Sequence, residues 1–342
     1  MAPVYATVAF VKLSRYLTIV AAKRKPVVVV SRKLPAAVEA RVQRDYTAIL
    51  NPQDRPYPSV ELLAKCAGAN AILACHTDRL DADVIAQLPD SIRAIGNISV
   101  GTDHVDLNAA AARGIIVTNT PGVLANATAE LTMLLILGAA RRAAEGQRMI
   151  RSGNWNTWSP SFMLGTEVTG KRLGIVGMGG VGQVTARRAR GFDMEIHYYN
   201  RHRLDAQTES GATYHANLDT MLAVSDVLAL HCPATPDTER LIDAQKLALL
   251  PDGAIVVNAA RGSVVDEAAL VAALQSGKLA AAGLDVFDNE PQIDPIWRQL
   301  DNVFLLPHVG SATRETRSAM GFMMLDDLDA IFAGREPKNR VA

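Results

Sequence analysis

The chain has 342 residues, of which 49% are hydrophobic and only 5% are aromatic. That length suits two domains of ordinary size, and cores built from Ala, Val, Leu and Ile suit parallel strands that helices cover on both faces. The 35 Lys and Arg residues balance 35 Asp and Glu residues, so the basic excess typical of a nucleic-acid-binding protein is absent. The composition favours a globular α/β protein without a nucleic-acid partner.

The cysteines and the apolar runs exclude further classes of protein. Cys66, Cys75 and Cys232 lack the spacing of a metal site or of a disulfide framework, which predicts no metal and favours the cytoplasm. The longest strongly apolar run, residues 131–140, is about half as long as a membrane-spanning helix. We therefore expect no membrane segment.

Residues 1–25 contain several Lys and Arg residues but neither Asp nor Glu, a composition that can mimic a transit peptide. The basic residues lie within and after the apolar stretch rather than before it, which fits a secretory signal badly. We expect an extension of unknown role that is unstructured or loosely docked, and a targeting peptide is the alternative.

From Pro26 onward, apolar strand patterns alternate with helical patterns. The first series predicts strands at 26–31, 71–75, 92–95 and 114–118, with helices at 35–44 and 82–88. These spacings are too long for β-hairpins, so the strands are expected to pair in parallel. A break at Thr120, Pro121 and Gly122 ends the series, and the longest helical pattern follows at 128–150.

A second alternating series begins at Arg172. It predicts strands at 173–177, 194–199, 226–230, 254–258, 283–285 and 303–306, and helices at 181–190, 218–224, 267–276 and 314–333. Together the two series predict an α/β fold of two doubly wound, Rossmann-like parallel-sheet domains with a cleft between them. We expect 26–121 plus 313–342 to form a substrate-binding lid domain and 122–312 a dinucleotide-binding domain.

A glycine-rich turn follows the first strand of the second series and opens a helix. It consists of Gly177, Met178, Gly179, Gly180, Val181 and Gly182. In a dinucleotide fingerprint the first glycine permits the tight turn, the second lets the pyrophosphate approach the backbone, and the third allows close helix–sheet packing. The free amides of the helix N-terminus would hold the phosphates. A glycine turn without a ligand is the alternative.

The residues after the next strand bear on the choice of cofactor. A site for NAD usually places Asp or Glu there to bind the ribose 2′-hydroxyl, whereas this chain has Asn200, Arg201, His202 and Arg203. No carboxylate repels a 2′-phosphate, and two guanidinium groups can bind it. We predict a preference for NADP(H), with Arg201 as the main contact and Arg203 as support. A solvated basic turn, and hence NAD, is the alternative.

Three charged residues lie at predicted strand ends or turns in the last third of the chain: Arg261, Glu290 and His308. A fixed cation, together with a carboxylate that can polarise a histidine, supplies what is needed beside a hydride donor. These residues and the fingerprint predict a nicotinamide-dependent dehydrogenase. Taken singly, each could be a surface salt bridge, a turn residue or a structural histidine.

Several motifs carry a more specific resemblance. They are Val100-Gly101-Thr102-Asp103-His104, Asn119-Thr120-Pro121-Gly122-Val123, Asn258-Ala259-Ala260-Arg261-Gly262, the segment from Gly283 to Pro291, and Pro307-His308-Val309-Gly310-Ser311. With these motifs in this order, the chain from about Pro26 onward resembles the D-isomer-specific 2-hydroxyacid dehydrogenases. Among subgroups it is most similar to the glyoxylate/hydroxypyruvate reductases.

The resemblance implies a role for each catalytic residue. Arg261 would hold the substrate carboxylate and polarise its carbonyl, His308 would give the proton as hydride arrives, and Glu290 would orient the imidazole. The implied reaction reduces glyoxylate or hydroxypyruvate with NADPH to the D-2-hydroxy acid, and a bulkier 2-oxo acid such as 2-ketogluconate is an alternative. A corepressor of the same fold, which binds the cofactor as a redox signal, is a second alternative.

Further sites follow from the same resemblance. Val100 and Gly101 match a loop whose amides bind the substrate carboxylate. The matching cofactor contacts are Thr128, His231, Cys232, Pro233, Ala259, Ala260, Asp285 and Gly310. Thr128 could instead cap the long helix, and Cys232 suits packing more than chemistry. Trp155 and Trp158 lie where related reductases send an aromatic side chain across a dimer interface, which implies a homodimer; a surface or hinge role is the alternative. His76 and His104 are taken as structural.

Overall fold

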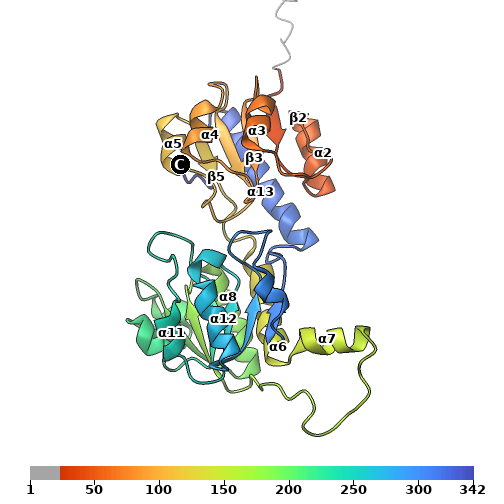
Figure 1. Cartoon of the computed structure of the whole chain (residues 1–342). Coiled ribbons are helices and arrows are strands. Elements are labelled where there is room, and N and C mark those ends of the chain that lie inside the picture. Colours follow the sequence, from red (N-terminus) through yellow and green to blue (C-terminus); the bar gives the residue numbers. More distant parts are fainter. Residues whose placement is uncertain (1–23) are drawn as a thin grey trace, which may run out of the picture.

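The computed structural model describes residues 24–342, which form two lobes joined by a narrow waist (Figure 1). The small lobe is built on a five-stranded sheet in the order β2-β1-β3-β4-β5, and the large lobe on a seven-stranded sheet in the order β12-β11-β10-β9-β6-β7-β8. Every named strand pair is parallel, as the spacings predict. Apart from Arg24 and Lys25, the expected extension lies outside the described residues.

The small lobe alternates strands and helices up to residue 118 and takes back the last helix of the chain. Its elements are β1 (Val27–Val30), α2 (Ala36–Asp45), β2 (Thr47–Ile49), α3 (Ser59–Lys65), β3 (Ala71–Ala74), α4 (Ala82–Gln87), β4 (Ala94–Asn97), α5 (Leu107–Ala112), β5 (Ile116–Thr118) and α13 (Arg314–Phe332). The inner face of α13, with Met324, Leu325 and Leu328, packs on β1, β3 and α2. The C-terminal residues then bond to β5, where the amide of Val341 donates to the carbonyl of Val117.

The large lobe holds the second series. Its strands are β6 (Arg172–Val176), β7 (Glu195–Tyr199), β8 (Thr213–His215), β9 (Val227–Leu230), β10 (Ala254–Asn258), β11 (Leu279–Leu284) and β12 (Val303–Leu305). Its helices are α6 (Ala125–Ala140), α7 (Ala143–Arg151), α8 (Gly180–Ala189), α9 (Ala206–Glu209), α10 (Leu218–Leu222), α11 (Ala244–Leu249) and α12 (Glu267–Gln275), with 3₁₀ turns η1 (Arg190–Phe192), η2 (Gly262–Val264) and η3 (Pro295–Arg298).

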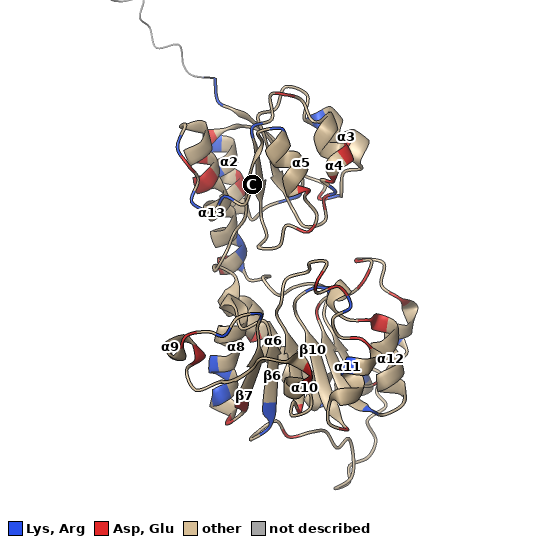
Figure 2. Cartoon of the chain, turned by 90° about the vertical axis from the view of Figure 1, so that its left-hand side faces the viewer, with Lys and Arg blue, Asp and Glu red and all other residues tan. Residues whose placement is uncertain are grey.

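Burial explains why these strands read as continuous apolar runs. All residues of β9 and β10 are buried, because α6 and α8 cover one face of the sheet while α10, α11 and α12 cover the other. Basic and acidic residues are interspersed along the elements of both lobes (Figure 2). Four acids are buried within residues 24–342: Asp78, Glu209, Asp285 and Asp327. No helix within residues 24–342 is both long enough and apolar enough to cross a membrane.

The predicted single helix at 128–150 is wrong. The structure has two helices, α6 and α7, because Arg142 adopts a left-handed backbone (φ 53°) and interrupts the first. The patterns also missed six elements, all of them short: β2, α3, α5, β8, α9 and α11. A short element holds few apolar positions, so its period is found in some cases, such as β12 and α10, and missed in others. The longer predicted elements are present within a few residues of their expected bounds.

The packing of α13 on the small sheet gives a stability prediction. A Cβ added at Gly96, on β4, would lie 2.8 Å from Cγ of the buried Met324 and 3.2 Å from Cδ2 of Leu73. Gly96→Ala is therefore expected to overpack this junction and lower the free energy of unfolding by about 1–3 kcal/mol, measured by urea denaturation followed by circular dichroism. Gly191→Ala, where nothing lies within 4 Å, should stay within about 0.5 kcal/mol of the parent. Equal stability of the two variants would contradict this packing.

Candidate active site

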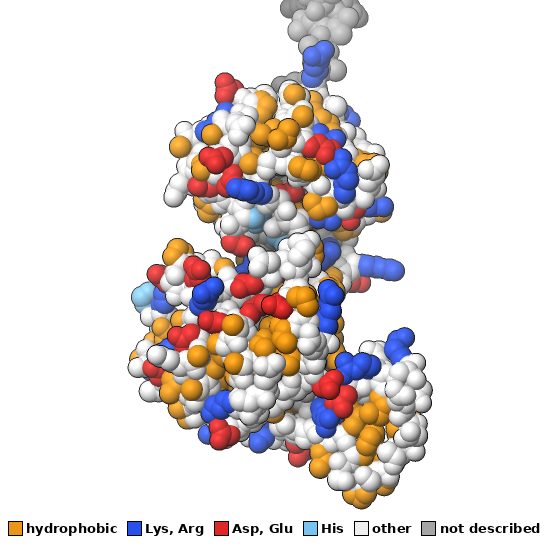
Figure 3. Space-filling model, in the orientation of Figure 1, with side chains coloured by type: hydrophobic (Ala, Val, Ile, Leu, Met, Phe, Trp, Pro, Cys, Tyr) orange, Lys and Arg blue, Asp and Glu red, His pale blue; other side chains and the backbone are white. Residues whose placement is uncertain are grey.

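A cleft of about 900 Å³ lies at the waist, lined by residues from both lobes. Histidine side chains are visible in this hollow between the lobes (Figure 3). The carboxyl ends of both sheets contribute to it: Cys75 and His76 follow β3, His231 follows β9, and Arg261 lies beyond β10. In open parallel sheets, ligands bind at this end, at the point where the strand order reverses direction. The cleft is therefore the place where a ligand is expected.

The glycine-rich turn lies at the switch point of the large sheet, between β6 and β9. A Cβ at Gly177 (φ 95°) would lie 2.6 Å from the amide nitrogen of Cys232, and one at Gly182 would lie 2.4 Å from the carbonyl oxygen of Gly177. Both positions require glycine. Gly179 has no atom within 4 Å of its added Cβ, and α8 begins at the next residue. This leaves an open approach to the free amides of a helix N-terminus, which fits a dinucleotide pyrophosphate.

His231 supports the same fit. Both of its ring nitrogens are buried and lack a hydrogen-bond partner within residues 24–342. Burial lowers the pKa of His231 to about 4, so the ring is neutral near pH 7. Its neighbour Cys232 is buried, and burial raises the pKa of that thiol to about 11, which suits packing rather than nucleophilic chemistry. A buried neutral ring without a partner beside the glycine turn is a group that a bound cofactor could satisfy.

The basic turn after β7, residues 200–203, is partly engaged in hydrogen bonds with the rest of the large lobe. The side-chain oxygen of Asn200 accepts from the amide of Met178 at 2.8 Å and so ties the turn to the glycine loop. Arg203 bonds both carboxylate oxygens of the buried Glu209, at 2.8 and 3.0 Å. Arg201 and His202 are exposed. Of the two arginines, Arg201 therefore has the unengaged guanidinium among the described residues.

Glu290 and His308 form a hydrogen-bonded pair. Nδ1 of His308 lies 2.6 Å from Oε2 of Glu290, and the other carboxylate oxygen accepts from the amide of Phe287 at 2.8 Å. Burial raises the pKa of Glu290, but the hydrogen bond and charge of His308 outweigh it and the net pKa is lowered. The carboxylate therefore stays ionised near neutral pH and fixes Nδ1 as a donor, which leaves Nε2 of His308 for chemistry.

A buried carboxylate holds the turn that carries His308. Asp285 is 1% exposed, and its two oxygens accept from the amides of Val309 and Gly310 at 2.7 and 2.8 Å. Its backbone carbonyl accepts from the amide of His308. Burial raises the pKa of Asp285. These bonds keep His308 in a left-handed conformation (φ 52°) that most residue types avoid.

Arg261 meets the small lobe across the cleft. Its Nε lies 3.3 Å from a carboxylate oxygen of Asp103, and its Nη1 donates to the carbonyl of Ala260 at 2.9 Å. A Cβ at Gly101 would lie 2.1 Å from Nη2 of Arg261, so a side chain there would displace the guanidinium from this position. Burial acts to raise the pKa of Asp103. The charge and hydrogen bond of Arg261 have the larger effect together, so the net pKa lies below its usual value. One guanidinium thus faces the backbone of residues 100–101 inside the cleft.

Comparison with known proteins identifies the family. The sequence model described as "D-isomer specific 2-hydroxyacid dehydrogenase, NAD binding domain" matches residues 133–310. The chain is 41% identical over 314 residues to a glycerate dehydrogenase of Hyphomicrobium methylovorum, covering 91% of this chain and 98% of that one. It is 40% identical over 322 residues to a glyoxylate reductase of Thermococcus litoralis, covering 93% and 97%. The chain belongs to the D-isomer specific 2-hydroxyacid dehydrogenases.

A solved structure of this family extends the likeness to three dimensions. The NADPH-dependent glyoxylate/hydroxypyruvate reductase of Sinorhizobium meliloti, in complex with NADP and malonate, superposes with a TM-score of 0.83 at 34% identity. The match covers 93% of this chain and 97% of that one. The two-lobed arrangement is therefore shared over nearly the whole chain.

The candidate residues fall into three groups within this dehydrogenase. Those that line the cleft are Val100, Gly101, Thr128, Gly179, Gly180, Val181, His231, Cys232, Pro233, Ala259, Ala260, Arg261, Asp285, His308 and Gly310. Glu290 lies behind His308 and reaches the cleft through it. Gly177, Met178 and Gly182 form the underside of the glycine turn, and residues 200–203 lie beyond the lined part. Thr128 does not cap α6, because the cap position is Leu124.

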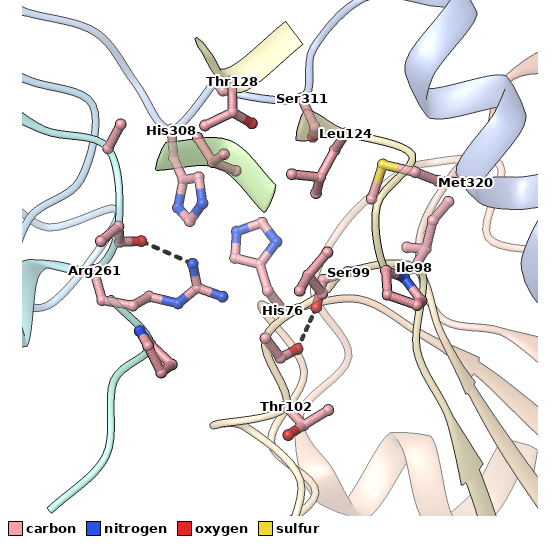
Figure 4. Close-up of a pocket in the computed structure, with 18 of the residues that line it drawn as sticks. His76, Ile98, Ser99, Thr102, Leu124, Thr128, Arg261, His308, Ser311 and Met320 are labelled. Atoms are coloured by element: carbon pink, nitrogen blue, oxygen red, sulfur yellow. Dashed lines mark hydrogen bonds between the residues drawn. The ribbon is translucent and has the colours of Figure 1, made fainter. Parts of the chain in front are cut away.

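Two residues of the cleft were not found from the sequence. His76, taken as structural, lies in the cleft with its ring centroid 4.5 Å from that of His308 (Figure 4); its place directly after a parallel strand was the available signal. Asp103 pairs with an arginine 158 residues away, for which the sequence offers no signal. His104 is hydrogen-bonded to Asn97, and burial lowers its pKa to about 4, which suits a structural histidine.

The pair of Glu290 and His308 gives a prediction for turnover by this dehydrogenase. His308→Asn removes the expected proton donor but tolerates the left-handed backbone better than most substitutions. We expect kcat to fall by about 10²–10⁴-fold, while the Kd of the nicotinamide cofactor, followed by its fluorescence, changes by less than about threefold. His215→Asn, on the edge strand β8, should leave both quantities unaltered. A comparable loss of cofactor affinity in His308→Asn would mean that the histidine is structural.

Proposed function

We propose that the chain reduces small 2-oxo acids, glyoxylate and hydroxypyruvate first, to D-2-hydroxy acids with NADPH. The observation that carries this proposal is the convergence of Arg261 and the bonded pair of Glu290 and His308 on one cleft beside the glycine turn. The names of the relatives support it, since they include glyoxylate reductases and a reductase solved with NADP. In this account the large lobe binds the cofactor and the small lobe supplies a substrate loop.

The substrate carboxylate would bind between the lobes. Arg261 offers a charged, planar set of donors, and Gly101 of the small lobe lies against its guanidinium. Asp103 and the carbonyl of Ala260 already hold Nε and Nη1 of the guanidinium, so Nη2 is the nitrogen without a hydrogen-bond partner within residues 24–342, and it would bind the substrate. Arg261 thereby fixes the carboxylate and draws electron density from the adjacent carbonyl.

His308 would supply the proton. Glu290 holds Nδ1, so Nε2 is the nitrogen that faces the carbonyl oxygen, and the charged carboxylate stabilises the protonated imidazole before transfer. When bound, the nicotinamide supplies the hydride that reduces the carbonyl carbon. Closure of the cleft excludes water from this exchange.

The cofactor would lie along the large lobe. The amides of the glycine turn hold the pyrophosphate, and the hydroxyl of Thr128 and the carboxylate of Asp285 line the nicotinamide side. Arg201 is the residue with a free guanidinium for a 2′-phosphate, while Arg203 stabilises the turn through Glu209. This supports NADPH, with NADH as the alternative. The corepressor alternative is not favoured, because the relatives carry the names of enzymes. The hydrogen bond between Glu290 and His308 also suits proton transfer.

The first experiment compares initial rates with glyoxylate and with hydroxypyruvate, each with NADPH and with NADH. We expect a higher kcat/KM with NADPH, and Arg201→Ala should reduce that preference by about tenfold, through the KM of NADPH rather than that of NADH. Arg335→Ala, an exposed arginine of the small lobe, serves as the charge-matched control. A preference for NADH in the parent enzyme would mean that the basic turn faces solvent and would overturn the NADPH assignment.

We also propose that the enzyme is a homodimer. The projecting α7 and the segment after it expose large apolar side chains (Figure 3), among them Ile150, Trp155, Trp158 and Leu164 at 55–75%. Apolar surface gathered on one projection marks an interaction site, and a second copy of this chain is the partner that the resemblance implies.

Light scattering after gel filtration tests this proposal. The parent enzyme should elute with about twice the chain mass of 36.6 kDa, whereas the double change Trp155→Ser and Trp158→Ser should shift it toward the monomer without a loss of secondary structure. A monomeric parent enzyme would refute the dimer.

A further inference from the structure

His76 lies at the switch point of the small sheet. The strand order β2-β1-β3-β4-β5 reverses between β1 and β3, and His76 is the second residue after the end of β3. Ligands of doubly wound sheets bind at such a point. The large lobe has its own switch point between β6 and β9, where the glycine turn lies. The cleft is therefore bordered by two switch points, and the assignments made so far use only one of them.

The turn that carries His76 is held by buried hydrogen bonds. Asp78 is 4% exposed and accepts from the amide of Cys75 at 2.7 Å and from the hydroxyl of the fully buried Ser31, at the end of β1. This carboxylate thus joins the ends of β1 and β3. The backbone of residue 76 is fixed by the same kind of device that fixes His308, in which a buried carboxylate accepts backbone amides.

The imidazole of His76 faces the catalytic groups. Its centroid lies 4.5 Å from that of His308, with the ring planes tilted by 40°, and Figure 4 shows it beside both His308 and the guanidinium of Arg261. Its Nδ1 contacts only Sγ of Cys75, at 3.5 Å. Within residues 24–342 its Nε2 has no hydrogen-bond partner, so this nitrogen is available to a ligand.

The surroundings favour hydrogen bonding over the other roles of a histidine. Ligand atoms of His76, Glu290 and His308 lie within 4.8 Å of one another, a spacing that could suit a metal ion, but Glu290 already accepts the hydrogen bond of His308. Burial, followed by the charge of Arg261, lowers the pKa of His76, so the ring is neutral near pH 7. In a neutral imidazole Nε2 is either a donor or an acceptor, and a hydroxyl group can pair with it in both cases.

We propose that His76 binds a hydroxyl group on C3 of the substrate and makes the enzyme selective for 3-hydroxy-2-oxo acids such as hydroxypyruvate. This inference rests on the proposed function. With the substrate carboxylate on Arg261 and its carbonyl oxygen on Nε2 of His308, two of the three directions from C2 are taken. The third, toward C3, would point to His76, which lies beside both His308 and the guanidinium of Arg261 (Figure 4). Pyruvate, which lacks the hydroxyl, would leave the imidazole unpaired, and such sites reject the analogue strongly.

The test compares kcat/KM for hydroxypyruvate, pyruvate and glyoxylate in four proteins: the parent, His76→Leu, His76→Gln and Thr77→Ala. Hydroxypyruvate and pyruvate differ by one hydroxyl, so their ratio measures its recognition, and glyoxylate has no C3 and measures the chemistry alone. We expect the ratio to fall at least tenfold in His76→Leu and to recover partly in His76→Gln, whose side-chain amide can replace Nε2. Thr77→Ala alters the same turn at an exposed side chain outside the cleft lining and should keep the parent ratio.

The outcomes separate this inference from the proposed function. An active parent whose ratio is the same in His76→Leu would overturn the role of His76 and leave the reductase assignment intact. An equal loss on all three substrates in folded His76→Leu and His76→Gln would also overturn it, because His76 would then act on His308 rather than on C3. If the parent reduced none of the three acids, the proposed function itself would fail. Melting temperature and NADPH fluorescence show whether each variant is folded and binds cofactor.

Discussion

The approach of Arg261 to the loop at residues 100–103 is the constraint on which the site depends. The guanidinium belongs to the large lobe and the loop to the small lobe, and they come so close that any side chain at position 101 would collide with Nη2. Asp103 adds a charge contact to the same guanidinium. A carboxylate that binds here must touch both lobes at once, so substrate binding and the relative position of the lobes are coupled. Free movement of the lobes would separate Arg261 from the loop at residues 100–103, which gives closure a chemical role rather than only a shielding one.

Two turns that carry cleft histidines, one in each lobe, are each held by a carboxylate that accepts a backbone amide. Asp285 holds the turn of His308, and Asp78 holds the turn of His76. Burial raises the pKa of both acids, a cost that the backbone bonds offset. Each turn follows a parallel strand and would otherwise be free to move, since loops have few internal contacts. The buried acids therefore convert two loop residues into fixed groups, as an acid–base reaction and a selective pocket both require.

Much of the fold could be predicted because its strands are buried on both faces. Segments such as 227–230 and 254–257 read as unbroken apolar runs at spacings that exclude hairpins, and the sheets are indeed wholly parallel. The catalytic candidates could be found because each belongs to a short motif at a strand end. What the sequence could not reveal depends on residues that meet only after folding. The bond of Arg203 to Glu209 requires α9 to turn back on β7, the pairing of Arg261 with Asp103 requires both lobes, and the left-handed Arg142 that separates α6 from α7 has no composition signal.

The two switch points suggest how one fold separates cofactor binding, at the large sheet, from substrate selectivity, at the small sheet. The point in the large sheet is formed by glycines whose added Cβ atoms would strike backbone, at Gly177 and Gly182, so its shape tolerates little change. At the switch point of the small sheet, the group that faces the cleft is a side chain, His76. The hydrogen bonds that hold its turn join Asp78 to Ser31 and Cys75 and do not involve the imidazole. Replacing that side chain leaves the turn's own hydrogen bonds in place. We therefore expect substrate selectivity to depend on the side chain at residue 76, because the turn that carries it keeps its fold when that side chain is replaced.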